Sequence, residues 1–306
     1  MADILATLFR FKQFLFEYVP LFLAAWLCLA VATGVITAVM RREADSISAG
    51  SPLLKRRPLR WLWQLLLVLL GQPGKESPAL NFSGWQFFGL AAAVPGLVAT
   101  SLIGSEAVWL RLVLAAIFAP ALNRIFVSIV LRRMENPERQ LPETGPSASL
   151  AAVLATFQPA PGERRATIIQ VIWKGFTGQV ERAVIPLIIG FGLASAVTIY
   201  VPSHSLIPWL GESAWPGPYL AAVLITPFQL VGGAEVALAS AMLVKGASLG
   251  TAMSVMLAAP VAAFSMLRQV RSTRKIRTVA LYLVAVWVTA GTLGAAVDGI
   301  GRLLDM

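Results

Sequence analysis

Long runs of apolar residues alternate along this chain with short stretches rich in arginine, proline and glycine. Five of these runs approach or exceed the ~20 residues that a helix needs to cross about 30 Å of hydrocarbon. They are Val19–Met40, Val108–Leu131, Ala183–Val201, Thr251–Leu267 and Val279–Leu293. The strands of a membrane β-barrel would instead alternate apolar and polar residues over ~10 positions. The pattern therefore predicts an all-α, polytopic transmembrane helical bundle.

Two hydrophobic blocks and a polar segment divide the chain. We expect a first transmembrane block over residues 1–132, a linker over 133–182 and a second transmembrane block over 183–306. The linker contains ENPERQLPETGPSAS and QPAPGERR, which are typical of a solvated loop, and its end could form one amphipathic helix, Ala166–Gly178. Arginines in the linker and in Arg268–Arg277 predict that both segments are cytoplasmic, because cytoplasmic loops of membrane proteins carry an excess of Lys and Arg.

A broken, re-entrant segment is predicted in the second block. If Pro202–Pro218 lies outside and Arg268 inside, then Tyr219–Val244 must begin and end on the outer side. Pro227 and the pair Gly232–Gly233 interrupt this segment and leave two short halves. Irregular backbone at membrane depth is tolerated only where protein or a water-filled cavity surrounds it. In transporters such breaks mark the substrate site, because the free helix ends direct their dipoles toward it.

Composition agrees with a membrane protein and excludes several chemistries. The chain is 57% hydrophobic and 13% charged, with a mean hydropathy of +0.74, whereas soluble domains carry roughly a quarter charged residues. The net charge of +10 does not indicate nucleic-acid binding, because the basic residues occupy short loops between apolar runs. A single cysteine, Cys28, and a single histidine, His204, allow no disulfide and no His–Cys metal cluster. We therefore expect no metal, no cofactor and no nucleic-acid partner.

The two blocks also resemble each other, which predicts a duplication. Glu17–Leu21 parallels Ala183–Leu187, Gly104–Val108 parallels Gly233–Ala237, and Ala115–Pro120 parallels Val255–Pro260. The spacings between these matches differ, so one block must carry insertions and deletions.

Part of this pattern resembles a known family. Pro186–Leu187, Gly232–Gly250 and Leu257–Pro260 combine a Gly-rich break, an apolar half-helix, a Lys–Gly–x–x–x–Gly turn and an Ala–Pro helix. In these features the chain is similar to predicted permeases of the YraQ type and to organoarsenical exporters of the ArsP type. Phe118–Asn123 matches the Pro–x–x–Asn helix of that family, whereas Glu106–Arg111 replaces the Lys–Gly turn in the first block. The resemblance implies export of a small solute. Many members carry cysteines in the first Gly-rich break that could bind soft metalloids; this chain has none there, so that chemistry is not carried over.

Ionisable side chains inside the bilayer are the first candidates for function, because they are costly there. Glu235 follows Gly232 and Gly233 and has two open interpretations. It binds a cation, a proton or a polar solute, or it is a structural carboxylate held by free N–H groups of the hairpin. Arg124, beside Asn123, either extends to the cytoplasmic surface or faces inward, where it would pair with Glu235 or bind an anion.

Prolines within two helices complete the candidate site. Pro120 and Pro260 each free a backbone carbonyl in mid-helix, which lines a cavity or merely permits a kink. The candidate substrate-binding residues are therefore Glu235, Gly232, Gly233, Asn123, Arg124, Pro120 and Pro260. Glu106 and Arg111 lie close to the outer end of their helix, and we expect both at the membrane interface.

These observations favour a transporter over an enzyme. The sequence offers no Ser–His–Asp set, no metal-ligand spacing and no Gly-rich phosphate cradle. We expect a secondary permease for a small solute in a bacterial inner membrane, with lipid and that solute as partners. The alternative is a transport-inactive scaffold or accessory subunit of a membrane complex, which the divergent first block favours. A homo-oligomer or a larger complex stays open.

Overall fold

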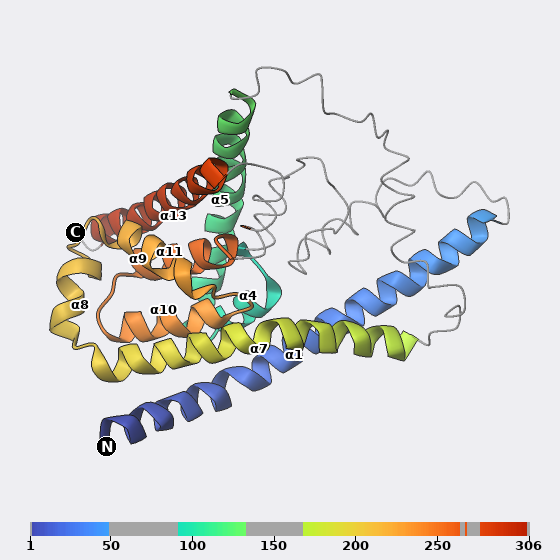
Figure 1. Cartoon of the computed structure of the whole chain (residues 1–306), viewed down its shortest axis with the longest axis horizontal. Helices are drawn as coiled ribbons and strands as arrows, with labels where there is room; N and C mark the ends of the chain where they lie inside the picture. Colours follow the sequence, from blue (N-terminus) through green and yellow to red (C-terminus); the bar gives the residue numbers. More distant parts are fainter. Residues whose placement is uncertain (1, 49–90, 133–167, 264–266, 268–275, 305–306) are drawn as a thin grey trace.

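The computed structural model describes residues 2–48, 91–132, 168–263, 267 and 276–304. Within those residues it contains helices and no strand, which confirms the predicted all-helical class (Figure 1). The elements are α1 (Ala2–Ser48), α4 (Val94–Thr100), α5 (Ser105–Arg132), α7 (Ile168–Tyr200), α8 (Ser203–Leu210), α9 (Gly217–Ile225), the 3-10 helix η3 (Thr226–Phe228), α10 (Ala234–Val244), α11 (Leu249–Val261) and α13 (Ile276–Leu304).

Four helices in the described part of the chain are long and apolar enough to cross a membrane. Their spans are Asp3–Ala32, Ser105–Ile125, Ala183–Tyr200 and Arg277–Leu304. Large apolar side chains on these helices point outward; Ile185 and Ile188 of α7, for example, are 67% and 55% exposed. Such faces match a protein that is covered by lipid rather than water.

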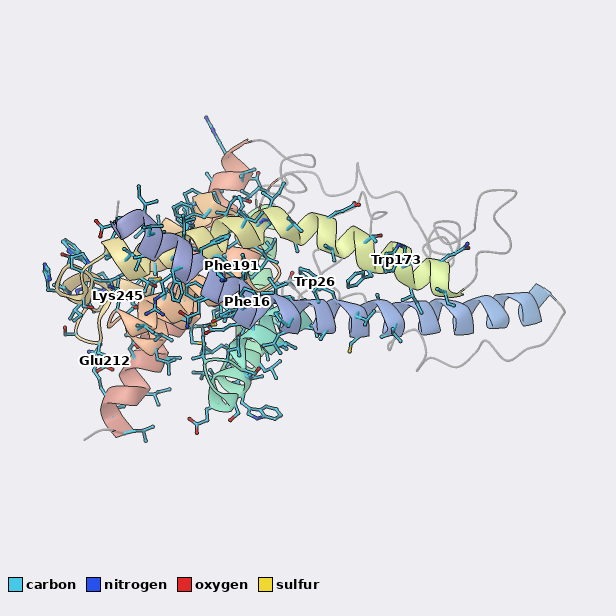
Figure 2. All side chains as sticks on the ribbon, turned by 90° about the horizontal axis from the view of Figure 1, so that it is seen from below. Phe16, Trp26, Trp173, Phe191, Glu212 and Lys245 are labelled. Atoms are coloured by element: carbon cyan, nitrogen blue, oxygen red, sulfur yellow. The ribbon has the colours of Figure 1, made fainter. Side chains whose placement is uncertain are left out.

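An aromatic cluster joins α1 to α7. The ring of Phe191 on α7 contacts Phe14, Tyr18 and Phe22 of α1, with centroids 5.8–6.4 Å apart. The two helices run along each other, with Phe191 beside the stretch of α1 that carries Phe16 (Figure 2). The Tyr18 hydroxyl also lies 3.1 Å from the Ser240 hydroxyl of α10. These contacts pack α1 against α7 and α10, two helices of the second block.

The helix break expected at Pro227 and the glycine pair is present. After α9 and η3, the backbone adopts positive φ at Gln229 (55°), Gly232 (72°) and Gly233 (101°), and α10 begins at Ala234. Glycine has no Cβ to oppose such angles, which explains the pair at this point.

The segment from α9 to α10 returns to the end of the molecule where it started. The turn after α10 lies against α8, because the Ser248 N–H donates to the Leu210 carbonyl at 2.8 Å. Glu212, between α8 and α9, and Lys245, after α10, lie at the same end of the molecule (Figure 2). Two half-length helices therefore start and end at the same end of the molecule, and their re-entrant placement in a membrane stays a prediction.

A buried carboxylate joins α11 to the end of α13. Asp298 accepts hydrogen bonds from the Gly250 N–H at 2.7 Å and the Ser248 hydroxyl at 2.6 Å, at the start of α11. At the other end of α11, the Tyr282 hydroxyl donates to the Val261 carbonyl at 2.7 Å. The two helices are therefore antiparallel, and every residue of α11 from Gly250 to Val261 is buried.

The helix that opens the second block starts earlier than the expected boundary. α7 runs without interruption from Ile168 to Tyr200, so residue 183 lies inside it. The described part of the expected amphipathic helix Ala166–Gly178 forms the first turns of α7 rather than a separate element. Residues 133–167 of the linker lie outside the described residues.

Candidate functional site

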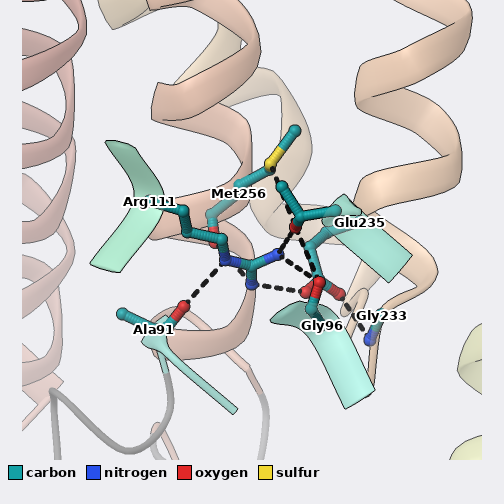
Figure 3. Close-up of polar contacts among 7 residues, drawn as sticks. Ala91, Gly96, Arg111, Gly233, Glu235 and Met256 are labelled. Carbon is teal, nitrogen blue, oxygen red and sulfur yellow. Dashed lines mark hydrogen bonds and ion pairs between the residues drawn. The ribbon is translucent and has the colours of Figure 1, made fainter. Parts of the chain in front are cut away.

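A buried ion pair lies where the two blocks meet. The Nη2 atom of Arg111 on α5 lies 2.8 Å from Oε1 of Glu235 on α10, and the two side chains are 0% and 2% exposed (Figure 3). The residues are 124 positions apart in the sequence. Removing two opposite charges from water is costly, and a protein tolerates it only where the charges are in close contact and make further hydrogen bonds.

The Arg111 guanidinium has an acceptor for each of its five N–H groups. Nε donates to the Ala91 carbonyl at 3.0 Å, and Nη1 donates to the Gly96 carbonyl at 3.1 Å and to the Thr100 hydroxyl at 2.9 Å. Nη2 donates to Glu235 and makes a longer contact, 3.5 Å, with the Met256 carbonyl. Arginine presents five donors in a rigid planar fork, which this set of acceptors matches.

Two of the acceptors are backbone carbonyls next to interruptions in the helices. Ala91 precedes the short turn that leads into α4. The Met256 carbonyl lies four residues before Pro260, and proline has no N–H to bond with it. The carbonyl that Pro260 was predicted to free therefore faces Arg111. Breaks in two separate parts of the chain supply oxygen atoms to one guanidinium.

Glu235 is held by the start of its own helix and by Arg111. Its Oε2 accepts from the Gly233 N–H at 3.0 Å, and its Oε1 accepts from Arg111. This position is in the first turn of α10, where free N–H groups and the helix dipole favour a negative charge. Both interpretations of Glu235, a ligand or a carboxylate held by hairpin N–H groups, agree with this geometry.

Gly96 leaves room for the pair. A Cβ built at this position would lie 2.8 Å from Nη2 of Arg111 and 2.9 Å from Oε1 of Glu235. Any side chain there would push the two charged groups apart or aside. Glycine at position 96 is thus required by the close approach of the α4 backbone to the ion pair.

The structure brings some of the sequence-predicted residues together and leaves others apart. Gly233 and Pro260 are buried beside the pair, in the break and in α11, and Gly232 is half-buried. Arg124 and Pro120 are exposed on α5, so Arg124 does not take the inward, Glu235-paired position. Asn123 is half-buried, and its Oδ1 is buried without a hydrogen-bond partner.

The expectation for Arg111 was wrong, because its side chain is fully buried. Glu106 is exposed, and its place at the membrane interface stays a prediction. Arg111 lies six residues after Ser105, about 9 Å along the helix axis. We expected a side chain this close to the helix start to reach the interface. The short helix α4 instead folds back against α5 and covers it, with Gly96 and Thr100 in contact with the guanidinium. The signal in the sequence was an arginine within the apolar run Val108–Leu131.

An apolar groove lies elsewhere on the described surface. It has a volume of about 380 Å³, and its lining includes Val201, directly after α7, with Leu206 and Trp209 of α8 and Leu220 and Leu224 of α9. Neither Arg111 nor Glu235 lines it. Among the residues that the structure describes, no group of three or more His, Cys, Asp or Glu side chains could hold a metal ion.

The helices and the buried pair define a polytopic membrane protein with a charged site at its helix breaks. Residues 88–298, which include both breaks, Arg111 and Glu235, match the model of the ArsP family, described as predicted permease. The chain belongs to this family of predicted permeases, and it is a multi-pass membrane protein. Membership indicates a transporter rather than an enzyme. Comparisons with curated proteins and with solved structures gave no match.

Proposed function

We propose that the chain is a secondary permease of a bacterial inner membrane, and that its small solute passes the point where Arg111 and Glu235 meet. The buried ion pair carries this proposal. Gly232, Gly233, Gly96 and Pro260 shape the backbone around it. Arg124 and Pro120 are not part of this proposed site, because their side chains are exposed.

Stability alone does not explain the pair. Well-packed apolar residues of similar volume often replace a buried ion pair with no loss, or even a gain, in stability. Ionisable residues inside a bilayer are therefore retained mostly where they bind or move something. Here the charges also lie beside free helix ends, which is the arrangement found at the substrate sites of transporters with broken helices.

A transport-inactive scaffold or accessory subunit is the second candidate. One observation favours it: every N–H of Arg111 already has an acceptor, and the side chain is fully buried. A saturated, closed site could hold the two blocks together and do nothing more. The two candidates differ in whether the intact protein moves a solute.

The topology of this permease can be tested by labelling. Single cysteines at Ser147, Ser213 and Ser272, in a chain with Cys28 replaced by serine, should report the side of each loop. We expect Ser213 to react with an impermeant maleimide from the periplasm, and Ser147 and Ser272 only after the membrane is opened. The loops that contain Ser147 and Ser272 carry the arginines that predict a cytoplasmic location. Periplasmic labelling of Ser272 would contradict the hairpin topology.

Transport can be tested without knowing the solute. Vesicles containing the purified chain would be loaded with glycolate, tetramethylammonium and erythritol, and the solute that leaves would be identified by mass spectrometry. We expect one class to leave faster than from protein-free vesicles. Gly96→Val should slow this efflux about ten-fold or more, because overpacking by 1–3 kcal/mol at the site corresponds to factors of that size.

Gly299→Ala is the matched control for the vesicle measurement. Gly299 also lies in a helix of the chain, but a Cβ there meets nothing within 4 Å. Solute efflux from vesicles that contain the Gly299→Ala variant should equal efflux from vesicles that contain the unaltered chain. Complete retention of all three solutes by folded, reconstituted protein would exclude the permease for these classes and favour the scaffold.

A further inference from the structure

The two partners of the ion pair are held very unequally. Without Glu235, Arg111 would retain acceptors at Ala91, Gly96, Thr100 and Met256, which belong to three different parts of the chain. Without Arg111, Glu235 would retain one hydrogen-bond partner among the described residues, the Gly233 N–H two residues away. The guanidinium is therefore the fixed charge of the site, and the carboxylate is the partner that can leave.

Glu235 fills a cradle built for a carboxylate. Its two oxygens accept from two separate donors, Nη2 of Arg111 at 2.8 Å and the Gly233 N–H at 3.0 Å. The second donor is part of the start of α10, where the helix dipole adds positive potential. Both donors belong to other residues, so a rotation of the Glu235 side chain would leave them in place, each free to bind one oxygen of another carboxylate.

Resting on the proposed permease function, we infer that the solute is a small organic anion whose carboxylate replaces that of Glu235 on Arg111 and Gly233. The side chain of Glu235 is then an internal competitor that occupies the site when no solute is bound. A fixed, permanently charged guanidinium can exchange one carboxylate for another at little cost in geometry. A cationic solute would have to displace Arg111 from five acceptors.

The surroundings limit the anion to a small one. Gly96 approaches the pair so closely that a Cβ would lie within 3 Å of both charged groups. Gly190 of α7 packs against Ala234, the residue before Glu235, and a Cβ added to Gly190 would lie 2.8 Å from the Cβ of that alanine. Small residues thus pack closely at these two points, and the ring of Phe22 lies against Gly233 on a further side. Packing this close favours a solute of a few heavy atoms over a larger one.

Binding to the purified full-length chain tests the inference directly. Melting of the protein in detergent would be followed at equal ionic strength in sodium glycolate, sodium chloride or tetramethylammonium chloride. We expect glycolate to raise the melting temperature more than either other salt. Glu235→Gln should lower the glycolate concentration needed by about ten-fold or more, because an internal competitor acts at an effective concentration in the millimolar range.

Two further variants distinguish binding of glycolate at Arg111 and Gly233 from nonspecific stabilisation by salt. In Arg111→Gln/Glu235→Gln both charges are removed together, so the fold keeps its shape without a lone buried charge, and the preference for glycolate should disappear. Glu212→Gln removes an exposed carboxylate and should leave the response unchanged. The inference is overturned if Glu235→Gln binds glycolate no better, if the double variant binds it equally well, or if tetramethylammonium stabilises the unaltered chain more.

The vesicle measurement distinguishes this inference from the permease proposal. Efflux of tetramethylammonium or erythritol, with glycolate retained, would support the proposed permease function and contradict the inference that the solute is an organic anion. Specific glycolate binding with complete retention of all three solutes would support the carboxylate cradle but not transport.

Discussion

Replacing Arg111 with glutamine is expected to destabilise the protein by about 3–5 kcal/mol, the range seen when one partner of a buried ion pair is removed. The substitution leaves the carboxylate of Glu235 buried, and among the described residues its remaining hydrogen-bond donor is the Gly233 N–H. It also leaves carbonyls at Ala91, Gly96 and Met256 without their guanidinium donor. Most of the expressed chain should aggregate or be degraded. Yield, elution profile and melting temperature in detergent would measure the effect.

A second substitution should restore much of this loss. In Arg111→Gln/Glu235→Gln no charge remains in the site, and the glutamine amides can hydrogen-bond to each other and to the nearby backbone. The double variant should therefore melt closer to the unaltered protein than Arg111→Gln does, and the coupling energy of the cycle should be large. Arg302→Gln, which removes an exposed arginine from α13, is the control and should change stability by less than about 0.5 kcal/mol. If Arg111→Gln alone melts like the control, the buried pair does not exist in the folded protein.

The hydrophobic pattern predicted the four helices that are long and apolar enough to cross a membrane, because lipid imposes long apolar helices on any spanning chain. The fifth run, Thr251–Leu267, contains α11, which ends at Val261 and is shorter than a span. The break before α10 was also predictable, since Pro227 cannot donate a hydrogen bond and the glycine pair can adopt positive φ. Glu235 could be selected for the same reason, as a carboxylate in an apolar segment next to that break. Each of these inferences depends on local sequence alone.

The partner of Glu235 was not predictable in this way. Arg124 and Arg111 both lie in the apolar run of α5, and nothing in the single sequence says which one faces the second block. Their places are decided by α4, whose seven residues are too few to leave a clear periodic signal. Asp298 escaped notice for a related reason: its role at the start of α11 depends on a contact between residues about fifty positions apart. The predicted duplication of the two blocks remains a prediction.

Replacing Gly233 with alanine is expected to cause the other large loss, because two separate costs coincide at this residue. Its φ of 101° is one that side-chain-bearing residues rarely adopt, which costs of order 1–3 kcal/mol. A Cβ would also overlap the ring of Phe22, which is fully buried and packed between Trp26 and Phe191. Overpacking of this kind adds roughly 1–3 kcal/mol.

Gly232→Ala separates these two costs. Gly232 also has positive φ, 72°, but a Cβ there would meet only the Ala183 Cβ at an ordinary 3.5 Å. It should therefore carry the backbone cost alone and melt between Gly233→Ala and Gly299→Ala, a helical glycine whose Cβ meets nothing. Adding Phe22→Leu should recover part of the loss in Gly233→Ala, because the smaller side chain relieves the overlap but not the backbone strain. If the two glycine variants of the break melt alike, the ring of Phe22 does not restrict the start of α10, and the hold of Gly233 on the carboxylate of Glu235 is looser than its 3.0 Å hydrogen bond implies.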